Sequence, residues 1–126
     1  MVERKLLQVY AETEIRDRLT GALRHWRFED GSICRTYRTN GWKGTMMAAN
    51  AIAHLAEVAW HHPELRATWP SVDVRLNTHE AGGVTDRDFE LALKIETFLQ
   101  WRPVGDGGAL EGTPADAAHA YIAIDA

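Results

Sequence analysis

The alternation of hydrophobic and polar positions predicts three helices. Apolar residues recur at helical spacing from Glu12 to Leu23, which indicates a first amphipathic helix. A second helix is expected from about Trp42 to Trp60, because this stretch is rich in Ala and Met and Pro63 then ends it. The third should begin after Thr85 and end near Trp101, ahead of a further proline.

Strand patterns lie between these helices. Aromatic and charged residues alternate over residues 26–28, and the turn Asp30-Gly31 leads into a β-branched and aromatic stretch at 33–39, which predicts a hairpin. Residues 72–78 alternate cleanly, and a shorter strand around 66–69 is expected before them. The order α, β, β, α, β, β, α predicts an α+β fold, in which a four-stranded antiparallel sheet carries three helices packed on one face.

The start of the third helix carries several signals at once. Thr85 is a natural N-cap, Asp88 follows at the position of a capping box, and Val84 with Phe89 can form a hydrophobic staple. One interpretation of Asp88 is therefore purely structural.

Length and composition limit the chain to one ordinary domain. The 126 residues are 45% hydrophobic and 25% charged, which is normal for a globular protein. We expect the domain to span residues 1–101 and a glycine- and proline-containing tail to span residues 102–126. Residues 115–126 of this tail are a candidate docked segment.

Charge and cysteine content exclude several function classes. The net charge is −4 and the basic residues are scattered, so a nucleic-acid partner is not expected. Cys34 is the only cysteine, which leaves no internal disulfide and no cysteine-based zinc site. Because no long apolar run and no leader pattern occur, no membrane partner is expected and the predicted location is the cytoplasm.

Three histidines are the strongest candidates for chemistry. His61 and His62 stand at or just beyond the end of the second helix, and His79 ends the last strand pattern. Imidazoles titrate near neutral pH, so two of them on opposite sides of a ligand could give one proton and remove another. Glu57 lies four residues before His61, where it could hydrogen-bond that imidazole. The pattern is suited to a dehydration.

Other interpretations of these residues stay open at this point. Adjacent histidines at a helix end can cap carbonyls and complement the helix dipole. A metal site from His54, Glu57 and His61, with His79 as a fourth ligand, is conceivable, although the spacing is not a recognised zinc pattern. Tryptophans are more typical of a core or a subunit interface than of a stacking platform, which applies to Trp42, Trp60 and Trp69.

The stretch from Glu57 to Asp88 resembles the signature of the pterin-4a-carbinolamine dehydratases. The matching positions, in order, are Glu57, His61-His62-Pro63, Trp69, His79 and Asp88. A looser resemblance in the order of helices and strands extends from about residue 12 to residue 101.

The resemblance implies a fold of three helices and four antiparallel strands that associates into dimers or tetramers. It implies removal of water from 4a-hydroxytetrahydropterin, with no metal and no organic cofactor. His61 and His79 would be the acid–base pair, and Glu57 would orient His61. The residues expected at the substrate are His62, Glu57, Asp88 and Trp69.

Some positions depart from the usual family pattern. The segment entering the second helix reads Gly41 to Met47 without the expected phenylalanine-rich pattern, Trp60 replaces a small or polar residue, and His54 is unusual. In this respect the chain is similar to a divergent branch associated with α-carboxysomes, whose members assist Rubisco assembly. The alternative function is therefore an inactive chaperone that contacts the Rubisco large subunit. A transcription-factor dimerisation cofactor is a more distant third.

Overall fold

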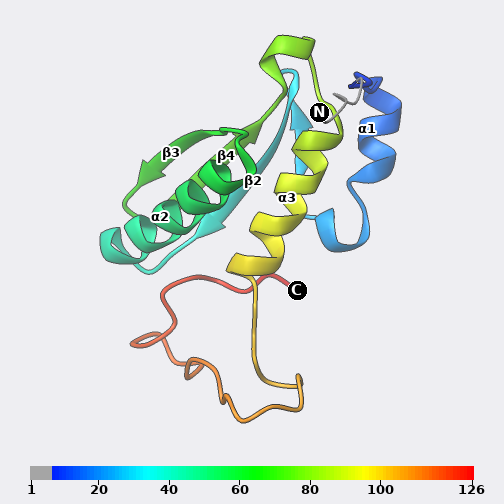
Figure 1. Cartoon of the computed structure of the whole chain (residues 1–126). Coiled ribbons are helices and arrows are strands. Elements are labelled where there is room, and N and C mark those ends of the chain that lie inside the picture. Colours follow the sequence, from blue (N-terminus) through cyan, green and yellow to red (C-terminus); the bar gives the residue numbers. More distant parts are fainter. Residues whose placement is uncertain (1–6) are drawn as a thin grey trace.

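The computed structural model describes residues 7–126 and places three helices on one face of an antiparallel sheet (Figure 1). The elements, in chain order, are α1 Glu12–Arg18, the 3-10 turn η1 Gly21–Leu23, β1 Arg27–Glu29, β2 Ser32–Arg38, α2 Trp42–Ala59, β3 Glu64–Thr68, β4 Ser71–Leu76, the 3-10 turn η2 His79–Ala81 and α3 Asp86–Leu99. The predicted α+β architecture is confirmed. Within residues 7–126, no helix is long and apolar enough to cross a membrane.

The sheet has the strand order β1-β2-β4-β3, and each neighbouring pair is antiparallel. Asp30 and Gly31 both take positive φ angles, 49° and 77°, which suit the tight turn between β1 and β2. In β4, Val72, Val74 and Leu76 are fully buried, as their alternation predicts, because they face α2 and α3.

The first helix is shorter than predicted. It ends at Arg18, and Gly21, the first residue of η1, takes a positive φ of 58°. Leu23 is nevertheless buried. The hydrophobic period therefore continues past the end of the helix, which explains why the sequence pattern overestimates its length.

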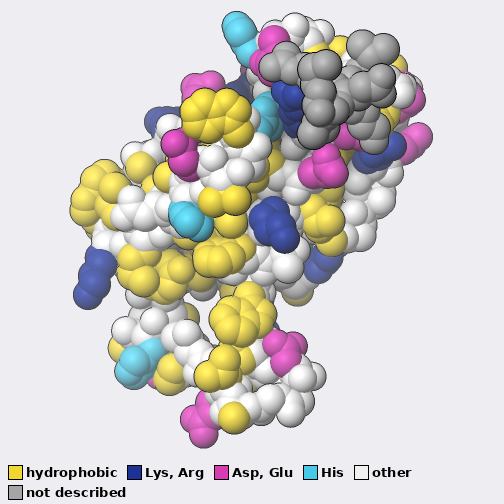
Figure 2. All heavy atoms as spheres, viewed as in Figure 1, with side chains coloured by type: hydrophobic (Ala, Val, Ile, Leu, Met, Phe, Trp, Pro, Cys, Tyr) yellow, Lys and Arg dark blue, Asp and Glu magenta, His cyan; other side chains and the backbone are white. Residues whose placement is uncertain are grey.

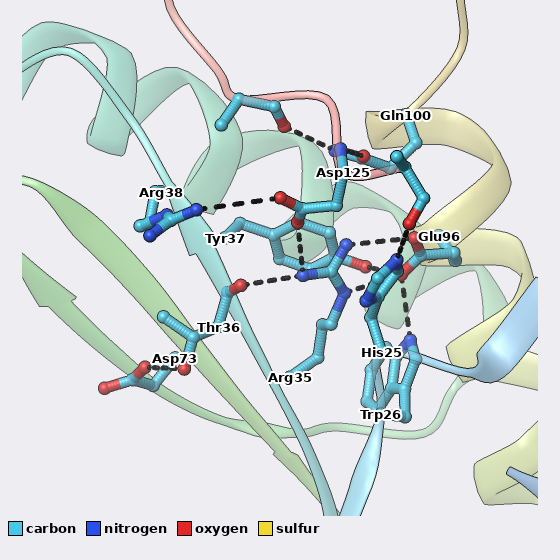
Figure 3. A network of polar contacts seen from close by, with 12 residues as sticks. His25, Trp26, Arg35, Thr36, Tyr37, Arg38, Asp73, Glu96, Gln100 and Asp125 are labelled. Atoms are coloured by element: carbon cyan, nitrogen blue, oxygen red, sulfur yellow. Dashed lines mark hydrogen bonds and ion pairs between the residues drawn. The ribbon is translucent and has the colours of Figure 1, made fainter.

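A buried polar network joins β2 to α3 (Figure 3). Arg35 is 3% exposed and donates to both carboxylate oxygens of Glu96, at 2.9 and 3.1 Å. The same carboxylate accepts from the hydroxyl of Tyr37 at 2.7 Å and the indole of Trp26 at 3.0 Å. Burial alone would raise the pKa of Glu96, but the hydrogen bonds from Arg35 and Tyr37 and the charge of Arg35 bring it below its usual value.

The tail leaves α3 and returns to the same end of the molecule (Figure 1). Ile122 forms an antiparallel bridge with Thr39, and the Asp125 carboxylate accepts from Arg35 at 2.8 Å. The sequence predicted a docked segment within residues 115–126, and these contacts show that the last part of that range packs against the domain. The boundary between residues 101 and 102 stays a prediction.

Gly44 permits this docking. It lies in the first turn of α2, and the Asn40 N–H donates to the Tyr121 carbonyl nearby at 3.0 Å. A Cβ at position 44 would stand 2.8 Å from that carbonyl oxygen. The unusual glycine in the segment that enters α2 therefore makes room for the tail backbone.

Candidate active site

The site begins at the C-terminus of α2, where the backbone turns sharply. Trp60 takes a left-handed conformation, with φ 53° and ψ 45°, and the His61 N–H donates to the Ala56 carbonyl at 3.1 Å. This is the Schellman arrangement, in which backbone N–H groups satisfy the last carbonyls of the helix. The imidazoles of His61 and His62 are therefore not needed as caps, and each contacts a carboxylate instead.

His61 is paired with Asp88 of α3. Its Nε2 lies 2.6 Å from Asp88 Oδ1, and the side chains of the two residues are 10% and 0% exposed. Asp88 Oδ2 also accepts from the Thr78 hydroxyl at 2.8 Å and from the Thr85 N–H at 2.9 Å. Three donors around one carboxylate suit its ionised form, which only accepts hydrogen bonds. In this contact His61 Nε2 carries the hydrogen, so the Nδ1 atom of the neutral form of the ring is the one whose lone pair can accept a proton from a ligand.

Asp88 makes two separate contacts through its two carboxylate oxygens, and its expected place at the substrate stays a prediction. It completes the predicted capping box with Thr85 at the start of α3, and the same carboxylate fixes the ring of His61. The two interpretations do not compete, because one oxygen binds the helix start and the other binds the imidazole.

His62 is held by Glu57. Its Nε2 lies 2.9 Å from Glu57 Oε1, and both side chains are more than half exposed. The prediction that Glu57 orients His61 is wrong. That prediction assumed a continuous helix, whereas the left-handed turn at Trp60 directs His61 toward α3 and brings His62 back over the last turn of α2.

His79 opens η2 and does not end a strand as predicted, since β4 stops at Leu76. It is exposed, and it directly follows Thr78, which donates to Asp88. A hydrogen bond from the Glu80 backbone N–H and the positive charge of Arg87 lower the pKa of the Glu80 carboxyl, which directly follows His79. Because Thr78 and His61 contact the same Asp88 carboxylate, the loop that carries His79 lies at the same end of the molecule as His61.

Trp69 is not brought to the histidines. The Thr45 hydroxyl donates to the Trp69 carbonyl at 3.1 Å, which places Trp69 beside the N-terminal turn of α2. That helix has 18 residues, so its two ends are roughly 25 Å apart at a rise of about 1.5 Å per residue. Because β3 runs back along α2 from Pro63, the β3–β4 turn lies at the far end of the molecule (Figure 1).

An apolar groove of about 380 Å³ lies between α2 and α3, with His61 in its lining. Its walls are mostly apolar and consist of Leu55, Val58, Ala59 and Leu91. Its charged lining residues are Arg87, Glu90 and Lys94. Residues 7–126 hold no group of three His, Cys, Asp or Glu side chains placed to bind an ion. This part of the chain therefore gives no support to the metal interpretation.

Comparison with known proteins matches residues 8–98 to the model of the family described as pterin 4 alpha carbinolamine dehydratase. The chain belongs to the pterin-4a-carbinolamine dehydratase family. A relative from Aquifex aeolicus, provisionally named as such a dehydratase, is 40% identical over 95 residues, which cover 75% of this chain and 95% of the relative. A relative from Haloarcula marismortui with the same provisional name is 40% identical over 90 residues, covering 71% and 95%.

A solved structure agrees with this dehydratase assignment. The crystal structure of a transcriptional coactivator/pterin dehydratase from Brucella melitensis has a TM-score of 0.62 and 29% sequence identity to this chain. The match covers 71% of this chain and 97% of the Brucella chain. In this dehydratase family member, the tail after residue 98 lies outside the matched family range.

Sequence reasoning missed two parts of this candidate site. The alternation over residues 72–78 predicts only a strand position for Thr78, yet its hydroxyl contacts both Asp88 and the Thr85 hydroxyl, at 2.8 and 2.6 Å. A buried threonine just before a candidate histidine was the available signal. The groove between α2 and α3 had no signal, because its shape depends on how two distant helices pack.

Proposed function

We propose that this chain removes water from 4a-hydroxytetrahydropterin, with His61 and His79 as the acid–base pair. The observation that carries this proposal is the His61–Asp88 pair, in which a buried carboxylate fixes one imidazole nitrogen beside the loop of His79. The family assignment supports the same reaction class.

The chemistry requires one proton donor and one proton acceptor. The bond between C4a and its hydroxyl breaks as an acid protonates the leaving oxygen, and a base removes the N5 proton. The electron pair of the N–H bond then forms the N5–C4a double bond, which gives the quinonoid dihydropterin and water. Asp88 would hold His61 so that Nδ1 of this ring gives a proton to the pterin or takes one from it. The exposed His62–Glu57 pair would bind the polar edge of the pterin.

The test replaces each histidine and follows dehydration of 4a-hydroxytetrahydropterin generated in place by an aromatic amino acid hydroxylase. His61→Ala and His79→Ala should each lower kcat by about 10²- to 10⁴-fold, down to the spontaneous rate if that is faster. His54→Ala is a control, because His54 is an exposed histidine of α2 that lies about two turns before His61. Unchanged kcat in both site variants would remove the assignment.

The chaperone alternative depends on a different feature, the exposed apolar side chains of α2. Four large ones are exposed along this helix, and Figure 2 shows hydrophobic side chains over this side of the molecule: Trp42, Met46, Met47 and Val58. Such a surface suits a protein partner, either a second copy in a dimer or tetramer or the Rubisco large subunit. Light scattering tests the first, and the yield of assembled Rubisco on co-expression tests the second. An unchanged yield would exclude the chaperone role.

A further inference from the structure

Trp60 occupies a backbone position that its side chain does not favour. Its φ of 53° and ψ of 45° lie in the left-handed region, which glycine and asparagine adopt readily at helix ends and bulky aromatic residues rarely adopt. Of the described residues other than glycine, only Asp30 shares a positive φ, and it lies in a tight hairpin turn. A tryptophan here therefore works against the local backbone preference.

Core packing does not explain this tryptophan. The residue is 74% exposed, so its indole contributes little to the hydrophobic core. Its aromatic contact is with His62, whose ring centroid is 5.0 Å away at an interplanar angle of 82°. Glu57 holds the same imidazole from its Nε2 atom. The ring of His62 is thus fixed by a carboxylate and by an indole.

The remaining indole surface is open to solvent beside His62. Planar bicyclic ligands stack well on tryptophan, and a pterin ring has this shape. A ligand that reaches His61 and His62 from solvent would pass close to this indole, because Trp60 directly precedes both residues in the chain. The Trp60 side chain can therefore both fix His62 and form one wall of the ligand site.

We propose that Trp60 is a positioning residue that also contacts the substrate, holding His62 and stacking against the planar ring of a pterin. The inference rests on the proposed dehydratase function and adds a determinant of affinity that is separate from the acid–base pair.

The test uses substitutions that separate the backbone from the side chain. Trp60→Gly relieves the left-handed position but removes the indole, so the melting temperature should rise by roughly 4 °C while KM rises about 10-fold and kcat changes little. Trp60→Phe keeps an aromatic ring and the unfavourable backbone, so it should leave KM within about 3-fold of wild type. Trp101→Gly, which removes another exposed tryptophan after α3, should leave KM unchanged.

Direct binding separates this inference from the proposed reaction. The dissociation constant of 7,8-dihydrobiopterin, measured by calorimetry, should weaken about 10-fold in Trp60→Gly whether or not the chain turns over substrate. Wild-type protein without activity but with this difference would remove the reaction and keep the role of Trp60. Equal KM and equal dihydrobiopterin affinity in wild type and Trp60→Gly would overturn the inference, even if wild type is an active dehydratase.

Discussion

Replacing Gly44 by alanine adds one methyl group where the tail meets α2. In an isolated helix this change is favourable, because alanine stabilises a helix over glycine by about 0.5–1 kcal/mol. Here the added carbon would stand 2.8 Å from the Tyr121 carbonyl oxygen and 3.1 Å from Asn40 Oδ1. The first of these is a backbone atom, so no side-chain rotation relieves the clash.

The two effects have opposite signs, and the tail decides which dominates. Overpacking costs about 1–3 kcal/mol, so after the helix gain we expect Gly44→Ala to destabilise the full chain by up to about 2.5 kcal/mol. In a chain that ends at Arg102, Tyr121 is absent and the same substitution should stabilise by about 0.5–1 kcal/mol. Such a shortened chain is reasonable, because the matched part alone makes up 95% of the Aquifex relative.

Urea unfolding of the four proteins, followed by circular dichroism, measures both effects as shifts in midpoint at constant slope. Hydrogen exchange adds a local readout, since the Asn40 amide that donates to Tyr121 should lose protection in full-length Gly44→Ala. If alanine stabilises the full and shortened chains equally, the tail does not pack against Gly44 and the docking described above is refuted.

Three further predictions follow from the polar networks. Glu96→Gln should destabilise the fold by about 1.5–3 kcal/mol in urea unfolding, because buried Arg35 then keeps only the Asp125 carboxylate as a counter-charge; a loss below about 1 kcal/mol would contradict this. The pKa of Glu96 is lowered in the folded state, so its contribution is present above its unfolded pKa of about 4.3 and is lost as pH falls through the lower folded value. Melting temperatures from pH 6 to pH 3 should therefore fall less steeply in Glu96→Gln than in wild type, and parallel curves would refute the assignment. Asp88→Asn should lower kcat by about 10²-fold or more, because an amide N–H that faces His61 Nε2 favours the other tautomer of His61. Adding His61→Ala to Asp88→Asn should then lower kcat little further. Fully additive losses of kcat would count against the pairing of the two residues.

Local signals predicted most of the fold. The alternation of Val72, Val74 and Leu76, the turn at Asp30-Gly31 and the capping box at Thr85 each correspond to an observed element. Such signals depend on neighbours within a few residues, so the sequence alone contains them.

Features that depend on one dihedral angle or on distant contacts could not be predicted. The carboxylate partners of His61 and His62 are set by the left-handed backbone of Trp60, which the helical period does not encode. The docking of Ile122 beside Thr39 joins residues far apart along the chain. The signature spacing also grouped Trp69 with the histidines, although an antiparallel strand carries it to the other end of α2.

The most direct test of the account is the dehydration rate of 4a-hydroxytetrahydropterin with catalytic amounts of the wild-type protein. We expect loss of the 4a-hydroxyl compound to accelerate in proportion to protein concentration, with a bell-shaped pH dependence set by one acid and one base. A rate equal to that in buffer at every protein concentration would contradict the function assigned to the His61 site.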